Sequence, residues 1–71
     1  MRNYLVTFSK AVLDGAGHDR RVVQRQVVIR SRSELSAAWE AKALFCSAAG
    51  IVDWRMRADI YEVADTADVA A

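Results

Sequence analysis

The sequence of 71 residues has no proline, one cysteine, one histidine and three glycines. A single cysteine excludes an internal disulfide, and a cysteine-based metal site normally needs at least two thiolates. Ten basic and nine acidic residues leave a formal charge of +1, so the overall charge favours no class of partner. No apolar run approaches the roughly 18 residues that cross a membrane, and the N-terminus has no apolar secretion signal. We therefore expect a cytoplasmic protein that contacts no membrane.

Apolar residues, in contrast, make up 54% of the chain, which is enough for a compact core and too many for a disordered tail. The length allows one domain, and a domain of this size buries only about 60% of the surface that its unfolded chain exposes. Neither a disulfide nor a recognisable metal cluster adds stability. Close packing or self-association must therefore supply it, and we expect a homodimer.

Two segments separated by a glycine-containing loop have the pattern of a β-hairpin. Residues 3–13 alternate large apolar side chains with smaller or polar ones, which is typical of a half-buried strand. Residues 14–19 include two glycines and two aspartates, which favour a loop longer than the tightest hairpin turn. Residues 20–31 are rich in valine, and their imperfect alternation predicts a second strand with a bend or bulge near residues 24–26.

A helix follows, and both of its ends are marked. Ser33 is a favourable N-cap, Glu34 places a carboxylate in the first turn, and Gly50 suits the left-handed residue that ends a helix. Apolar side chains recur between these ends at helical spacing. They belong to Leu35, Ala38, Trp39, Phe45, Cys46 and Ala49.

Residues 52–63 alternate apolar with charged side chains and predict a third strand, whereas the small residues and aspartates after them predict a frayed tail over residues 64–71. Residues 1–63 then form a single α+β domain of ββαβ order. A right-handed crossover places the third strand antiparallel beside the first, which gives a three-stranded antiparallel sheet of order 2-1-3. Residues 3–9 carry no charge, as expected of a central strand, while both outer strands carry charged side chains.

We expect the helix to cover one face of this sheet and to bury the aromatic rings, because so small a domain has few other large side chains for its core. The predicted core packs Leu35, Trp39 and Phe45 of the helix against Tyr4, Val6, Phe8, Trp54, Met56 and Ile60. The other face is left to solvent or to a partner. Two copies of the chain can associate by pairing the edges of their second strands or by stacking the uncovered faces through Leu5 and Val28.

Side chains with reactive chemistry are few. The composition around His18 suits a solvated turn better than a metal site. Cys46 falls near the C-terminal end of the helix, where the dipole disfavours a thiolate, so we expect a buried core thiol. Asp53 and Asp59 lie about 20 Å apart on an extended strand, too far for a pair of catalytic carboxylates. We predict no catalytic residue, no metal and no cofactor, and hence no enzyme; the alternative is a catalytic or metal site at an oligomer interface.

Arginine is the one suggestive feature. Five arginines occur between residues 20 and 32 with no acidic residue among them, and two more fall on the predicted third strand. Such a patch suits carboxylates of a protein or phosphates of a nucleic acid, although an ordinary solvated edge has the same composition. We expect a partner-binding surface on the uncovered face of the sheet. It comprises Arg25, Arg30, Arg32, Arg55, Arg57 and Tyr61.

The segment Tyr4-Leu5-Val6-Thr7-Phe8, the loop Asp14-Gly15-Ala16-Gly17, a basic strand and one alanine-rich helix resemble, in size and architecture, the short proteins of phages and mobile elements, such as anti-CRISPR inhibitors. The resemblance covers the whole chain in architecture and carries over no site residue. It implies a non-catalytic protein that binds a larger protein or nucleoprotein complex. The alternative is a nucleic-acid-binding module whose arginines contact phosphates.

Overall fold

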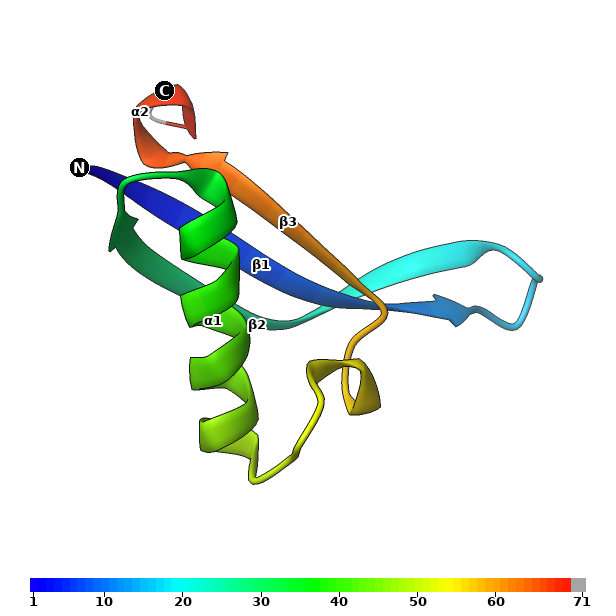
Figure 1. Ribbon diagram of the computed structural model, residues 1–71. Coiled ribbons are helices and arrows are strands. Elements are labelled where there is room, and N and C mark those ends of the chain that lie inside the picture. The colour runs from blue at the N-terminus through cyan, green and yellow to red at the C-terminus, as the bar shows by residue number, and fades with distance from the viewer. Residues whose placement is uncertain (70–71) are drawn as a thin grey trace.

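The computed structural model describes residues 1–69 as two layers, a three-stranded antiparallel sheet and a helix that crosses one of its faces (Figure 1). The elements in chain order are β1 (Arg2–Leu13), β2 (Asp19–Ser31), α1 (Glu34–Ala49), the 3-10 turn η1 (Trp54–Met56), β3 (Ile60–Asp65) and α2 (Thr66–Val69). The strands lie in the order β2-β1-β3. The predicted α+β class, the ββαβ order and the strand order 2-1-3 are therefore confirmed.

β1 and β2 form a long hairpin with one irregularity. The register shifts between Phe8 and Ser9 of β1, where Gln24 is an extra residue in β2. This is the predicted bulge, and a bulge increases the local twist of a strand pair. β3 pairs only with residues 4–9 of β1, so the outer half of the hairpin, residues 10–22, has two strands. In Figure 1 this outer half extends away from the layer that α1 covers.

The loop at the end of the hairpin is closed by Asp14. Its carboxylate oxygen Oδ1 accepts hydrogen bonds from the backbone N–H groups of Ala16 and His18, both at 2.9 Å. Gly17 has a φ of 82°, a conformation that glycine adopts without steric cost. The predicted loop is therefore confirmed, with the second strand beginning at Asp19.

Both ends of α1 are capped by the predicted residues. The Ser33 side chain accepts a hydrogen bond from the N–H of Ser36 at 3.2 Å. At the other end Gly50 has a φ of 68°, and the N–H of Ile51 donates to the Cys46 carbonyl at 3.0 Å. This pattern satisfies carbonyl groups that the end of a helix leaves without partners.

The core lies between α1 and the sheet. Val6 and Phe8 of β1 are fully buried, and α1 meets them with Ala37, Ala41 and Phe45. The ring centroids of Phe8 and Phe45 are 4.6 Å apart. Small side chains on the helix leave room for large ones on the sheet, so the two layers interdigitate.

Three side chains predicted for this core lie outside it. Leu35 and Trp39 are 81% and 78% exposed, and Met56 is 62% exposed. Since an α-helix turns by about 100° per residue, Leu35 and Trp39 point more than a quarter turn away from the line of Ala41 and Phe45. The buried face of α1 is thus its alanine-rich face. Of the other predicted core residues, Trp54 packs against the core while half-buried.

The predicted third strand over residues 52–63 is correct only over residues 60–63 and wrong over residues 52–59. The Asp53 carboxylate accepts a hydrogen bond from the backbone N–H of Arg55 at 3.0 Å and so caps η1. A carboxylate that bonds to the backbone two residues ahead favours a turn over an extended chain. β3 begins at Ile60 and continues to Asp65.

The frayed tail predicted from residue 64 is wrong for the residues described there. β3 runs through Asp65, which is buried, and α2 follows. The Asp65 carboxylate accepts hydrogen bonds from the Arg2 guanidinium and from the N–H of Ala67, each at 3.0 Å. The start of β1 and the end of β3, which are neighbours at one end of the sheet, are thereby joined. Residues 70–71 of the predicted tail lie outside the described residues.

Candidate functional site

Arginines are concentrated along the edge strand β2. Four lie on β2 and a fifth follows it directly, and all five are exposed. They are Arg20, Arg21, Arg25, Arg30 and Arg32, and we call them the arginine edge. In the sheet of residues 1–69, β2 has a neighbouring strand on one side only. Backbone donors and acceptors on its other side can therefore pair with an added strand.

The arginine edge has guanidinium groups on both faces of β2. Directly opposed residues of an antiparallel pair share a face, so Arg30 lies on the face away from α1 and Arg25 on the α1 face. Because Gln24 is an extra residue, Arg21 also lies away from α1, where its guanidinium forms an ion pair with Glu62 of β3. Arg25 and Arg30 therefore place positive charge on both faces of the strand, whereas the charge of Arg21 is paired with Glu62.

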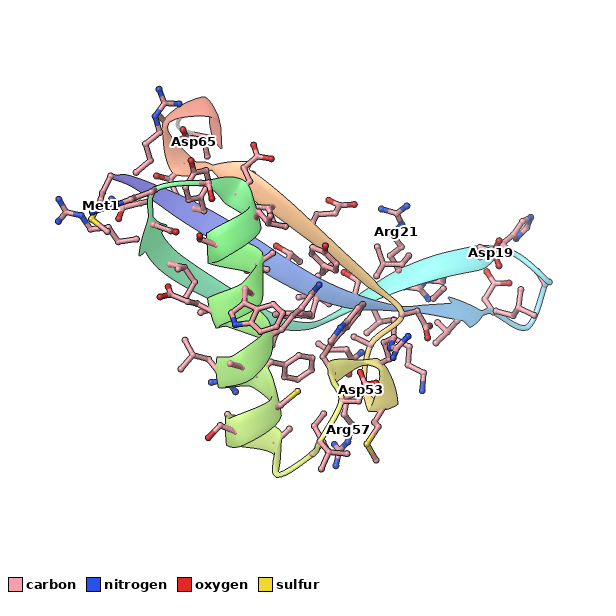
Figure 2. The ribbon with its side chains drawn as sticks, viewed as in Figure 1. Met1, Asp19, Arg21, Asp53, Arg57 and Asp65 are labelled. Carbon is pink, nitrogen blue, oxygen red and sulfur yellow. The ribbon has the colours of Figure 1, made fainter. Side chains whose placement is uncertain are left out.

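Arg55 and Arg57 do not belong to this edge. Arg55 lies within η1 and Arg57 ends it, and η1 lies near the C-terminal end of α1 (Figure 1). Figure 2 shows Asp53 and Arg57 together at this turn, away from Arg21 on the hairpin. The prediction that these two arginines share the uncovered face with Arg30 is therefore wrong, since this part of the chain is a helical turn and not a strand.

An ion pair within η1 engages Arg55. Its Nη2 lies 2.8 Å from Oδ2 of Asp53. Hydrogen bonds from the Arg55 side chain, together with one from its backbone N–H, hold the pKa of the Asp53 carboxyl below its usual range. Arg55 thus stabilises the local turn, which makes it, like Arg21 beside Glu62, a poorer candidate for partner binding than Arg25 and Arg30.

Tyr61 lies on the opposite edge strand from the arginine edge. Its ring is on the α1 face of β3, where Lys42 Nζ of α1 lies 3.9 Å from the ring centroid. Trp54 meets the same ring edge-on, with the centroids 5.4 Å apart. Tyr61 is therefore part of an aromatic cluster beside α1. Contact between a partner and any of the six predicted residues stays a prediction.

A second surface, which the sequence analysis missed, lies on the exposed flank of α1. It is formed by Leu35, Trp39, Ala43 and Cys46, and we call it the α1 stripe. A hollow of about 280 Å³ lies beside its C-terminal half. The lining residues are Trp39, Lys42, Ala43, Cys46, Val52, Asp53 and Trp54. A signal was present in the sequence, because alanines at positions 37, 38 and 41 mark a packing face that turns Trp39 outward.

Reactive side chains are dispersed. Cys46 is half-buried at the hollow, so the prediction of a buried core thiol is only partly correct. His18 is exposed, with Nδ1 3.7 Å from Oδ2 of Asp14, as predicted for a solvated turn. Asp59 accepts a hydrogen bond from the N–H of Ala11 at 3.0 Å and so links its loop to β1. Across residues 1–69, no three His, Cys, Asp or Glu side chains gather into a group that could hold a metal ion.

The character of the helices and the similarity of the chain to known proteins also bear on its function. Among the helices described within residues 1–69, none combines the length and the apolar character that crossing a membrane requires. The arginine edge and the α1 stripe are the two candidate binding surfaces of the protein. The chain matches no protein-family model, no curated protein and no solved structure.

Proposed function

We propose that this protein is a non-catalytic interaction protein that binds a larger protein or nucleoprotein complex through its arginine edge. The observation that carries the proposal is a group of exposed arginines along a strand whose outer side is open, with Arg25 and Arg30 on its two faces and Arg21 alone turned toward Glu62 of β3. No acidic residue occurs between residues 20 and 32, so this region is positive although the whole chain is nearly neutral. Guanidinium groups form paired, charge-assisted hydrogen bonds with carboxylates.

The occupant that this edge suits best is an extended acidic segment of the partner. Such a segment can add to the sheet as a fourth strand, because the outer side of β2 offers main-chain hydrogen bonds. Its carboxylates then meet arginines on both faces, where Arg25 and Arg30 lie. Pairing of two β2 edges, in contrast, brings arginines of like charge together, which is destabilising across strands.

Binding of this kind works by occupying a surface of the partner. The protein then acts as an inhibitor by exclusion, a role that fits the architectural resemblance to small phage and mobile-element proteins such as anti-CRISPR inhibitors. The expected place of action is the cytoplasm, where the lone thiol of Cys46 stays reduced.

The test uses a short fluorescein-labelled peptide that alternates glutamate with threonine, and a second peptide with glutamine in place of glutamate. We expect the acidic peptide to bind, to lose affinity with added salt and to slow hydrogen exchange of β2 amides. The double charge reversal R25E/R30E should weaken binding by about tenfold or more, since charge complementarity is lost. R55E should bind as the unaltered protein does, because Arg55 lies in η1.

Equal binding of the glutamine peptide, or no protection of β2 amides, would overturn this proposal. Single-stranded and double-stranded DNA serve as the comparison ligands. Tighter binding to either DNA would point to a nucleic acid as the partner, provided that the logarithm of the binding constant falls linearly with the logarithm of the salt concentration. The arginines would then contact phosphates in place of carboxylates.

A further inference from the structure

The chain exposes more surface than its mass requires. Its accessible surface is 5167 Å², whereas a compact monomer of 7.9 kDa exposes about 4,400 Å². The surplus of about 770 Å² is close to the roughly 800 Å² that each partner buries in a standard protein interface. The flat shape and the extended hairpin contribute to this surplus, and an interface of ordinary size can cover an area of the same order.

The α1 stripe is an apolar part of the exposed surface that lies on one element. Leu35 and Trp39 are among the most exposed large apolar side chains of the molecule, and Val52 lies next to the stripe at the hollow. Three charged residues border the stripe: Glu40 lies beside Trp39 and Ala43, Asp53 lines the hollow, and Lys42 holds its ammonium group over the Tyr61 ring. Only the aliphatic stem of Lys42 is left to the stripe. Such a surface suits an apolar partner and not the acidic one that the arginine edge suits.

We infer that the α1 stripe joins two copies of this chain as an antiparallel pair of α1 helices around a twofold axis. Leu35, Trp39 and Cys46 of the stripe, with the stem of Lys42 between the last two, have the spacing 35, 39, 42 and 46, which is the alternation of four and three found where two helices pack along a seam. A twofold axis near the middle of α1 places Leu35 of one copy opposite Cys46 of the other. The same axis places Trp39 opposite the Lys42 stem and Ala43.

Size complementarity supports this arrangement. The large side chains, Leu35 and Trp39, occupy the N-terminal half of the stripe, and the small ones, Ala43 and Cys46, occupy the C-terminal half beside the hollow. Antiparallel pairing sets the large half of each helix against the small half of the other. Leu35 of each copy then enters the hollow of the other copy. A surface that complements itself in this way is the requirement for an isologous dimer.

The inference does not depend on the proposed function. The stripe faces η1 and β3, since the hollow is lined by Trp54 and since Lys42 reaches Tyr61. The arginine edge lies on β2, at the other side of the sheet. Both arginine edges therefore stay free in the dimer.

Sedimentation at micromolar concentration tests the inference with substitutions of exposed residues that leave the fold intact. We expect the unaltered chain to sediment as a dimer. Trp39→Glu should raise the dimer dissociation constant by about thirtyfold or more, as loss of a central tryptophan does in other interfaces. Leu13→Glu, an equally exposed apolar position at the end of β1, is the control and should dimerise normally. Circular dichroism confirms that each variant is folded.

Disulfide trapping tests the pairing itself. Leu35→Cys should form a covalent dimer on mild oxidation by linking to the native Cys46 of the other copy, and Leu35→Cys with Cys46→Ser should not. Within one chain these positions are about 16 Å apart along the helix, too far for a disulfide. Leu44→Cys, on another flank of α1, is the matched control and should stay unlinked. A monomer at all concentrations, a dimer that Trp39→Glu leaves intact, or a link that survives Cys46→Ser would each overturn the inference.

Discussion

Two alanines decide how closely α1 approaches the sheet. Ala37 and Ala41 are fully buried over the core that contains Val6 and Phe8. Packing in a protein interior is as dense as in an organic crystal, so a side chain that is too large forces neighbours out of position. Substitution of Ala37 or Ala41 should therefore disturb the fold more than substitution of the larger Trp39, which lies outside the core.

Ala41→Leu should lower the free energy of unfolding by about 1–3 kcal/mol, because the core has no room for three more carbon atoms. Urea unfolding followed by circular dichroism measures the change. Ala48→Leu places the same side chain on an exposed position of α1 and should alter stability by no more than about 0.5 kcal/mol. Equal losses in both variants would contradict the assigned orientation of the helix.

The pKa of the Asp53 carboxyl group shows whether Asp53 and Arg55 are in contact at η1. Hydrogen bonds from Arg55 lower its pKa, so its ionised form is favoured in the folded chain. The stability that this contact contributes is complete above the ordinary pKa of aspartate and is lost as the pH falls through the lowered value. We expect carbon-13 NMR to show the Asp53 carboxyl titrating below the ordinary pKa of an aspartate. Arg55→Gln should raise this pKa toward its ordinary value, while Arg57→Gln should leave it unchanged.

At the scale of elements, local signals predicted most of the fold. The alternation in β1, the loop at Asp14 and the caps at Ser33 and Gly50 each act over a few residues, and all four are found in the structure. The third strand was misplaced because alternating residues after Gly50 imitate a strand, whereas Asp53 caps a helical turn. Such a contact between a side chain and the backbone overrides the alternation.

Gly50→Ala tests the C-terminal cap of α1. A Cβ at this position would meet no atom within 4 Å, so only the left-handed backbone opposes the substitution. We expect a loss of about 1 kcal/mol in unfolding free energy. Gly15→Ala is the control, because Gly15 has no positive φ and equally open surroundings; it should be neutral or slightly stabilising. An equal loss in both variants would argue against the cap.

The candidate surfaces were harder to foresee than the elements. The four arginines of β2 and Arg32 directly after it could be located from the sequence, because β2 is an edge strand in the order 2-1-3. Their separation from Arg55 and Arg57 depends on η1, and the exposure of Trp39 depends on which face of α1 meets the sheet. Both are properties of tertiary packing, which residue spacing alone does not determine.

At the scale of the whole molecule, the protein is flat, with extents of 43 × 33 × 15 Å. Much of its length is the hairpin, whose outer half lies beyond β3 (Figure 1). A ribbon of two strands is only marginally stable by itself, while three strands packed on a helix are stable together. The three-stranded part that packs on α1 should thus be more stable than the outer half of the hairpin, which carries Arg20 and Arg21.

Hydrogen exchange should reveal this division. Amides of residues 10–13 are expected to exchange at least about tenfold faster than those of residues 4–8, because local opening of the outer half exposes no core. Asp59→Ala removes the hydrogen bond to the Ala11 N–H and should speed exchange in the outer half alone. Uniform rates along β1 would show that the hairpin opens only with the whole domain.

The bulge at Gln24 has a genetic consequence. Every pair between β1 and β2 is formed without this residue, so loss of its single codon would leave the partners of both strands unchanged. The extra twist at that point would disappear, and the tip carrying Arg20 and Arg21 would point in a new direction. Evolution can therefore re-aim the hairpin in one step without replacing any amino acid that takes part in pairing.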